Sequence, residues 1–180
     1  TPKTMLVKFS MSIDRVCSDI GFPLVLKMVS GSKGFGVHLC ETKHAFQEIL
    51  EIMSAQVHHS PMIIQEFVKG SYGCDLRVFV LNGKAIACMK RTACSGFKAN
   101  YSQGGTVGPY PITPEIEQLA CSTAALFGLD VAGVDLLFDG SGFKVCEANS
   151  SPGLQGIELA SKRDIAAEMI EYVRQSVLRS

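Results

Sequence analysis

The sequence predicts an α+β fold with mostly antiparallel sheets, arranged in two lobes. Three observations lead to this fold class. Strand-like and helix-like segments alternate along the 180 residues, four segments show the apolar periodicity of an amphipathic helix, and strands are joined by short glycine-containing turns that favour antiparallel hairpins. A hydrophobic content of 47% excludes a disordered chain. A chain of this length can bury a core as one domain or as two closely packed lobes.

The first third of the chain is predicted to contain two helices and three strands. Apolar residues recur at helical spacing over residues 10–20, and Gly21 is expected to end that helix. Thr42 is a good N-cap for a second helix that runs to about Val57. Apolar runs at 23–29, 37–40 and 62–67 indicate strands. The side chains expected to face inward from the two helices are Ile13, Val16, Cys17, Ile20, Phe46, Ile49, Leu50 and Met53.

The middle of the chain begins with its strongest hairpin signal, Asn82-Gly83, which lies between strand-like runs at 76–81 and 84–90. A glycine-rich, irregular stretch is expected at about 92–110. Thr113 caps the next helix, with Pro114 at its first position and an end near Phe127-Gly128.

The last third is predicted to contain two strands, at 131–138 and 143–149, and then a loop at 150–164. A final helix is expected from about Asp164 to Leu178. Its inward-facing side chains are predicted to be Ile165, Met169, Ile170, Val173 and Val177.

Three oxygen-bearing side chains on the last two strands, Asp135, Glu147 and Asn149, are the most informative feature. A three-residue loop, Gly140-Ser141-Gly142 with Gly142 in the left-handed conformation, would pair Asp139 with Phe143. That register places Asp135 opposite Glu147, with Asn149 on the same face. Oxygen ligands without His or Cys fit Mg²⁺ or Mn²⁺, which typically hold phosphates. A two-residue loop would break the alignment, and a solvent-facing acidic pair on an edge hairpin is the alternative interpretation.

A glycine loop at 30–36, Ser-Gly-Ser-Lys-Gly-Phe-Gly, joins two predicted strands and follows Lys27. Its glycines would let the backbone approach a polyphosphate, and Lys27 and Lys33 would add positive charge. The loop is neither a Walker loop nor a dinucleotide fingerprint. A hairpin tip without a ligand is the more common explanation of such a loop taken alone.

The segment from Gln65 to Val68 is a third candidate, because a strand that ends in a linker can offer backbone groups to an adenine edge. Asp75, a few residues on, could accept ribose hydroxyls. Taken alone, Glu66 and Asp75 are better explained as ordinary polar strand termini, and that interpretation is preferred.

Composition limits the partners. The formal net charge is zero, so there is no electrostatic case for nucleic acid. The seven cysteines are scattered without a CxxC pair, which predicts reduced thiols in a cytoplasmic protein and no zinc. No signal peptide and no membrane-spanning run is present, so no membrane partner is expected. The sequence does not exclude a homo-oligomer.

Taken together, these segments resemble the ATP-grasp carboxylate–amine ligases, particularly the RimK-type glutamate ligases. The resemblance covers nearly the whole chain and rests on the order of its motifs. The motifs are GFPLVLK, SGSKGFGV, QEFVKGSYGCDLRVFV, KRTACSGFKANYSQGG, DVAGVDLLF and CEANSSPGLQGIE. It implies two α+β lobes that grip ATP between them, a smaller one at about 1–67 and a larger one at about 68–180 that carries the metal site.

The resemblance also implies roles for individual residues. Lys27 would hold ATP phosphates, and the loop with Ser30, Gly31, Ser32, Gly34 and Gly36 would close over them. Glu66 and Val68 would meet adenine through their backbones, with Gln65 and Phe67 flanking, and Asp75 would take the ribose. Arg77 would face the phosphates or serve a structural role. Asp135, Glu147 and Asn149 would bind magnesium, and Arg91 would lie near the transferred phosphate. Asn100 matches an active-site asparagine, and Lys98 stands where close relatives often carry Arg.

The activity that the resemblance implies is an ATP-dependent ligation through an acyl phosphate, most simply the addition of glutamate to a protein or small-molecule carboxylate. A small-molecule ligase of amino-acid or N-acyl dipeptide biosynthesis, a catalytically silent ATP-binding module and a phosphotransferase are the alternatives. The family normally has a further N-terminal domain, so the chain is interpreted as the ATP-grasp portion of a longer protein. No covalent nucleophile is expected, because no base is placed to activate Cys94.

Overall fold

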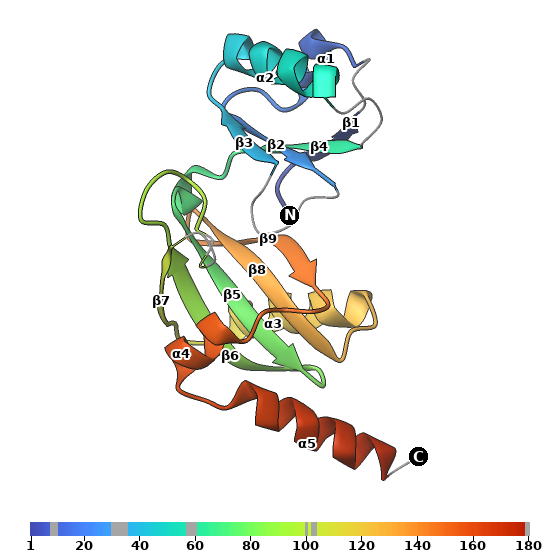
Figure 1. Cartoon of the computed structure of the whole chain (residues 1–180), viewed down its shortest axis with the longest axis vertical. Helices are drawn as coiled ribbons and strands as arrows, with labels where there is room; N and C mark the ends of the chain where they lie inside the picture. The colour runs from blue at the N-terminus through green and yellow to red at the C-terminus, as the bar shows by residue number, and fades with distance from the viewer. Residues whose placement is uncertain (8–10, 30–35, 57–60, 100, 102–103, 179–180) are drawn as a thin grey trace. The chain divides into compact units, whose positions relative to one another are not determined.

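The computed structural model describes residues 1–7, 11–29, 36–56, 61–99, 101 and 104–178. The chain divides into two compact units, Thr1–Lys69 and Gly70–Ser180. Each unit has one sheet with its own helices (Figure 1), and every strand pairing in both sheets is antiparallel. No helix in the described part of the chain is long and apolar enough to cross a membrane.

The first unit is a four-stranded sheet in the order β1-β4-β2-β3, with two helices on one face (Figure 1). Its core forms because alternate strand residues, such as Leu24 and Leu26, point toward Val16 and Phe46 of the helices. The elements are β1 (Thr4–Val7), α1 (Ile13–Asp19), β2 (Leu24–Met28), β3 (Val37–Cys40), α2 (Lys43–Gln56) and β4 (Met62–Glu66).

Both predicted helices of this unit are confirmed, with shifts at their ends. Thr42 caps α2, because its Oγ1 accepts a hydrogen bond from the Ala45 N–H at 3.2 Å. α1 is shorter than expected: Ser12 is its N-cap, and Gly21 ends it with φ +77°. Strand β1 was not expected, because four residues without a turn signal do not indicate a strand by themselves. In the structure, β1 forms by pairing with β4.

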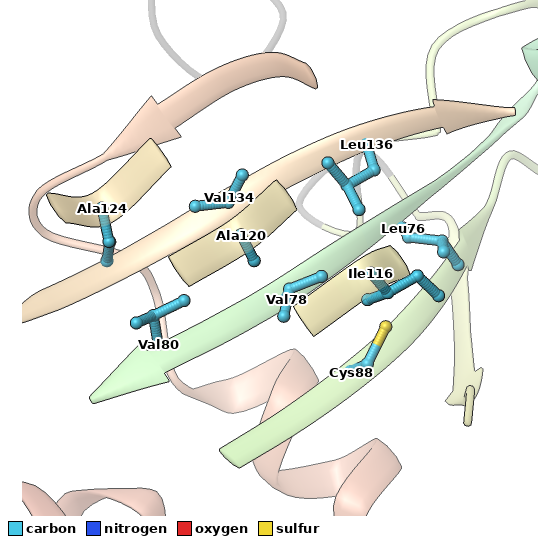
Figure 2. Close-up of a cluster of buried hydrophobic side chains, with 10 residues drawn as sticks. Leu76, Val78, Val80, Cys88, Ile116, Ala120, Ala124, Val134 and Leu136 are labelled. Carbon is cyan, nitrogen blue, oxygen red and sulfur yellow. The ribbon is translucent and has the colours of Figure 1, made fainter. Parts of the chain in front are cut away.

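The second unit is a five-stranded sheet in the order β7-β6-β5-β8-β9. One face packs on α3, as Figure 2 shows for Ile116 and Ala120 against the strand residues Val78 and Leu136. The other face packs on α4 and the start of α5 through Phe79, Met89 and Ile157, among others. The 3₁₀ turn η1 (Lys69–Ser71) spans the boundary between the two units in the sequence. The elements that follow are β5 (Cys74–Leu81), β6 (Lys84–Thr92), β7 (Thr106–Pro109), α3 (Pro114–Leu126), β8 (Val131–Asp139), β9 (Gly142–Asn149), α4 (Gln155–Ser161) and α5 (Ile165–Val177).

Local signals predicted two features of this unit correctly. The β5–β6 hairpin turns at Asn82 (φ +49°) and Gly83 (φ +70°), and the left-handed conformation of both residues is what a type I′ turn requires. Helix α3 begins at Pro114 after the N-cap Thr113, whose side chain accepts from the Ile116 N–H.

Three expectations for this unit were wrong. The stretch at 92–110 is not wholly irregular, because Thr106–Pro109 forms β7 against β6. The predicted loop at 150–164 contains α4, which has no side-chain cap and is held by the burial of Gly156, Ile157 and Ala160. The inward face predicted for the last helix holds only near its start: Ile165 is buried and Met169 is partly buried, whereas Ile170, Val173 and Val177 are 56–70% exposed.

Candidate functional site

The β8–β9 hairpin places Asp135 opposite Glu147 and Gly133 opposite Asn149. The predicted pairing of the two carboxylates is therefore confirmed, but the turn from which it was inferred is wrong. The loop has two residues, Gly140 and Ser141, and Asp139 pairs with Gly142 rather than with Phe143. Gly140, and not Gly142, has the left-handed conformation, at φ +60°.

A β-bulge in β9 restores the alignment that the short loop would lose. Leu136 pairs with Val145 and Asp135 with Glu147, so Cys146 is the extra residue on β9. Without the bulge, the two-residue loop would pair Asp135 with Cys146 and turn Glu147 to the other face. The bulge therefore determines that both carboxylates point to one side of the sheet.

Strand alternation gathers the charged residues on one face. On β5, Leu76 and Val78 point into the core beneath α3, so Asp75 and Arg77 point to the opposite face. Register places Arg91 of β6 beside Asp75, and Asp135 of β8 beside Arg77. Four neighbouring strands thus contribute to one polar patch on the sheet.

The buried side chains of this patch form a chain of alternating charges. Arg91 donates from Nε to Asp75 Oδ1 at 2.6 Å and from Nη2 to Asp75 Oδ2 at 2.7 Å. The same Nη2 donates to Asp135 Oδ2 at 2.7 Å. Arg77 donates from Nε to Asp135 Oδ1 at 2.7 Å and from Nη2 to Asp135 Oδ2 at 2.8 Å. Charge-assisted, bidentate bonds of this kind are strong and define orientation.

Burial makes these pairs sensitive to the loss of a partner. The Arg91 and Asp135 side chains are each 5% exposed, and those of Asp75 and Arg77 are each 15% exposed. A buried ion pair stabilises a fold little relative to apolar residues, but removal of one partner costs about 3–5 kcal/mol. The chain of charges is therefore a precise arrangement that the fold maintains around Arg91 and Asp135.

The same environment sets the ionisation of the two aspartates. Burial alone would raise the pKa of Asp135, but Arg91 and Arg77 outweigh it and hold that pKa below its ordinary value. Burial raises the pKa of Asp75, and the neighbouring Asp135 charge adds to this, although Arg91 opposes both. Of the two aspartates, Asp135 is therefore the one whose ionised form the surroundings favour more strongly, as suits a cation ligand.

Glu147 and Asn149 lie on the same face of the hairpin as Asp135. The Asn149 Nδ2 donates to the Gly133 carbonyl oxygen at 3.3 Å and to Glu147 Oε1 at 3.2 Å. Across the described residues, no group of three His, Cys, Asp or Glu side chains gathers into a metal site. Asp135, Glu147 and Asn149, two carboxylates and one amide, are the candidate cation ligands, and oxygen donors of this kind suit Mg²⁺ and Mn²⁺.

Gly133 is a residue of this site that the sequence reasoning missed. A Cβ atom at this position would lie 2.7 Å from the Pro152 Cβ and 3.6 Å from the Arg77 Cδ. The missing side chain thus lets the segment after β9 fold back beside Arg77. A glycine inside a predicted strand is the signal that could have indicated such a close approach.

A second missed glycine, Gly73, holds the segment that follows β6. Its N–H donates to the Phe97 carbonyl at 3.3 Å, and its own carbonyl accepts from the Ala93 N–H at 2.8 Å. Gly73 has φ +68°, and a Cβ there would lie 2.9 Å from the Gly96 oxygen. Segment 93–98 lines a cavity of about 230 Å³ together with Gly105, and Lys98 is part of this lining.

In the first unit, Lys27 and Gln65 lie on the sheet face opposite α1 and α2. The strand neighbours Leu26 and Ile64 are buried in the helical core, and alternation turns Lys27 and Gln65 away from it. Gln65 is buried and its Nε2 donates to Thr4 Oγ1 at 2.9 Å. The Glu66 N–H donates to the Lys3 carbonyl, so a backbone contact of Glu66 with adenine would use its carbonyl oxygen.

The remaining predicted residues are only partly described. Phe67 donates its N–H to the Pro23 carbonyl, Val68 is buried, and Gly36 has φ +69°. Ser30, Gly31, Ser32, Gly34 and Asn100 lie outside the described residues.

Comparison with known proteins gives a family match over nearly the whole chain. The model described as the RimK-like ATP-grasp domain matches residues 1–173. A probable alpha-L-glutamate ligase from Methanococcoides burtonii is 45% identical over 158 residues, which cover 87% of this chain and 52% of the relative. The protein of that name from Aeromonas salmonicida is 42% identical over 160 residues, which cover 88% and 53%. The chain spans about half the length of these curated relatives.

Solved structures share the fold at low sequence identity. D-alanine–D-alanine ligase from Bacillus anthracis superposes with a TM-score of 0.76 at 18% identity, covering 99% of this chain and 62% of that one. A RimK domain protein from Sphaerobacter thermophilus gives 0.73 at 21%, covering 96% and 61%. The ATP-grasp ligase PsnB, in a complex with a precursor variant, Mg and ADP, gives 0.73 at 21%, covering 98% and 54%. The predicted fold class is confirmed.

Proposed function

The chain belongs to the family of RimK-like ATP-grasp domains, and from this premise we propose that it is the nucleotide-binding portion of an ATP-dependent ligase that joins a carboxylate to an amine. The observation that carries the proposal is the chain of charges from Asp75 through Arg91 to Asp135, with Glu147 in register beside it. This arrangement supplies fixed positive charge and an ionised oxygen ligand on one face of a sheet, as the handling of phosphates requires.

The chemistry explains why ATP is needed. A carboxylate is too stable to react with an amine in water. An oxygen of the acceptor carboxylate attacks the γ-phosphorus, the bond from that phosphorus to the β–γ bridging oxygen breaks, and ADP leaves. The amine nitrogen then attacks the carbonyl carbon of the acyl phosphate, phosphate leaves, and loss of a proton gives the amide. Alignment and charge neutralisation are the contributions that a protein makes to such a phosphoryl transfer.

Arg91 is proposed as the residue that stabilises the transferred phosphoryl group. Its Nε and Nη2 are held by Asp75 and Asp135, so a phosphate would be met by Nη1. Asp75 and Asp135 raise the pKa of Arg91 above its ordinary value, even though burial alone would lower it. A fixed and permanently charged guanidinium needs no reorganisation when negative charge develops.

Asp135, Glu147 and Asn149 are proposed to hold a magnesium ion. The ion would neutralise the β- and γ-phosphates and draw charge from the transferred group. The oxygen chemistry of the three donors and the ionised state of Asp135 support this assignment.

The nucleotide contacts are proposed as follows. Each oxygen of Asp75 accepts one bond from Arg91, and a carboxylate oxygen has a second lone pair, so Asp75 could accept a ribose hydroxyl and hold Arg91 at once. Lys27 and the 30–36 loop would contact the phosphates. Residues Gln65, Glu66, Phe67 and Val68 would form the adenine edge. Lys98 and Asn100 belong to the segment that would enclose the acyl phosphate and exclude water.

Glutamate is proposed as the amine, because the curated relatives are named probable alpha-L-glutamate ligases. Amine-dependent phosphate release would distinguish a ligase from a phosphotransferase. A phosphotransferase would release ADP at the same rate with and without glutamate.

Calorimetric titration with ATP, with and without magnesium, tests the site itself. The double variant Asp135→Asn, Glu147→Gln should lose magnesium-dependent affinity by at least about tenfold, and Glu147→Gln alone should lower it while leaving the bonds from Arg77 and Arg91 to Asp135 intact. Asp139→Asn is the matched control, because Asp139 lies on the same strand and pairs with Lys144 outside the site. Unchanged MgATP binding by the double variant would overturn the metal assignment.

A further inference from the structure

Arg77 lies between the two carboxylates of the candidate cation site. Register places it directly beside Asp135 across the β5–β8 ladder, and its guanidinium holds both oxygens of that residue at 2.7 and 2.8 Å. The Arg77 Nη2 also lies 3.9 Å from Glu147 Oε1. Arg77 therefore places a positive charge where a divalent cation bound by both carboxylates would need to approach.

We propose that Arg77 neutralises the Asp135–Glu147 pair in the nucleotide-free protein, so that the pair binds a divalent cation only together with a nucleotide. The proposal rests on the function proposed above and adds that the cation binds only when the nucleotide is bound as well. The phosphates of the nucleotide supply the negative charge that offsets Arg77, and a free cation does not.

The charge count favours this role. In formal charge, Asp75, Asp135 and Glu147 contribute −3 and Arg77 and Arg91 contribute +2, so these five side chains sum to −1. Removal of Arg77 would leave −2. At a few ångströms and in a largely buried patch, one unit of charge beside a divalent ion changes its affinity by at least about tenfold.

Packing keeps the Arg77 guanidinium in this position. Its side chain is 15% exposed, and the Cδ passes beside Gly133, where a Cβ would lie 3.6 Å away. The fork geometry of two parallel hydrogen bonds to Asp135 leaves little rotational freedom. A cation that binds both Asp135 and Glu147 must therefore compete with a guanidinium that is already oriented.

A direct contact of Arg77 with the nucleotide phosphates is the competing explanation, and it predicts different behaviour. If Arg77 acted only as a phosphate ligand, its loss would weaken nucleotide binding and leave nucleotide-free cation binding unchanged. The proposal instead expects a gain in nucleotide-free cation affinity when Arg77 is removed.

Titration with Mn²⁺ in the absence of nucleotide, followed by electron paramagnetic resonance of the free ion, separates these explanations. Arg77→Met should bind Mn²⁺ at least about tenfold more tightly than the parent chain. Adding Glu147→Gln to Arg77→Met should remove that gain, which places the new affinity at this pair. Arg77→Lys keeps the charge but loses the two parallel bonds to Asp135, so it should gain less Mn²⁺ affinity than Arg77→Met. Equal Mn²⁺ affinity in the parent and in Arg77→Met would overturn the proposal.

A second measurement tests the role of Arg77 without the Arg77→Met variant, in case that variant does not fold. In the parent background, Glu147→Gln should leave nucleotide-free Mn²⁺ binding unchanged, because Arg77 already neutralises the pair, and should weaken the binding of Mn²⁺ with ADP. Weaker nucleotide-free binding in Glu147→Gln would overturn the proposal.

The two proposals fail differently. If the parent chain binds Mn²⁺ with ADP through Glu147 but Arg77→Met gains no affinity for Mn²⁺ alone, only the role of Arg77 is wrong. If Glu147→Gln does not affect Mn²⁺–ADP binding, the metal site of the proposed function fails, and the inference about Arg77 fails with it.

Discussion

Asp75 and Arg91 face each other across the β5–β6 ladder and form a bidentate ion pair, with Nε–Oδ1 at 2.6 Å and Nη2–Oδ2 at 2.7 Å. Arg91 reaches Asp135 from the same Nη2. One guanidinium thus connects the residue proposed to bind ribose with a proposed ligand of the metal. The orientation of Arg91 depends on both carboxylates.

Asp75→Asn tests how much this ion pair contributes to the stability of the fold. The amide has one acceptor oxygen where the carboxylate has two, and it carries no charge, so we expect the free energy of unfolding to fall by about 3 kcal/mol, as for other broken buried pairs. Urea denaturation measures the change. The matched control is Asp19→Asn, which breaks the exposed Arg15–Asp19 pair and should cost less than about 1 kcal/mol. Equal effects of the two variants would show that the Asp75–Arg91 pair is not a determinant of stability.

Gly133→Ala tests the close approach behind the site. The added methyl group would lie 2.7 Å from the Pro152 Cβ, so we expect a loss of about 1–3 kcal/mol from overpacking and weaker MgATP binding as the segment after β9 shifts. Gly108→Ala is the control, because Gly108 is also a strand glycine but has nothing within 4 Å of the added atom. Thermal denaturation and ATP titration of both variants decide the question. Full stability of Gly133→Ala would mean that the segment after β9 moves aside without cost.

The cysteines should differ in reactivity. Burial raises the pKa of Cys40 to about 11 and that of Cys88 to about 12, so both thiols stay protonated at pH 8, whereas Cys94 is exposed. Iodoacetamide at pH 8, with mass spectrometry of the peptides, should label Cys94 first and label Cys40 and Cys88 only after unfolding. Labelling of Cys88 at the rate of Cys94 in the folded protein would contradict the buried position.

The same shifts give a direction for alkaline stability. The folded-state pKa values of Cys40 and Cys88 lie above the unfolded value of about 8.5. The folded protein therefore keeps protons that the unfolded chain loses. The contribution of these thiols is fully present below about pH 8.5 and is lost as the pH rises toward about 11–12.

Local sequence signals were sufficient where a backbone conformation or a cap decides the structure. Asn82-Gly83 specifies its hairpin because both residues take the left-handed conformation, and Thr42 and Thr113 begin their helices because each hydroxyl accepts from a free N–H group. Where long-range packing decides, those signals were not sufficient. The strands β1 and β7 form because β4 and β6 pair with them, and α4 forms because Ile157 is buried.

The candidate site shows the same division. The residue types on the two strands can be identified from the sequence alone, and they make Asp135 and Glu147 candidates for one face of a hairpin. Tertiary structure decided that they meet, because a two-residue loop combined with the Cys146 bulge sets the register. It also decided that Arg91 joins Asp75 to Asp135 and that Arg77 lies between Asp135 and Glu147. Those contacts depend on the order and register of four strands, which the spacing of residues along one chain does not contain.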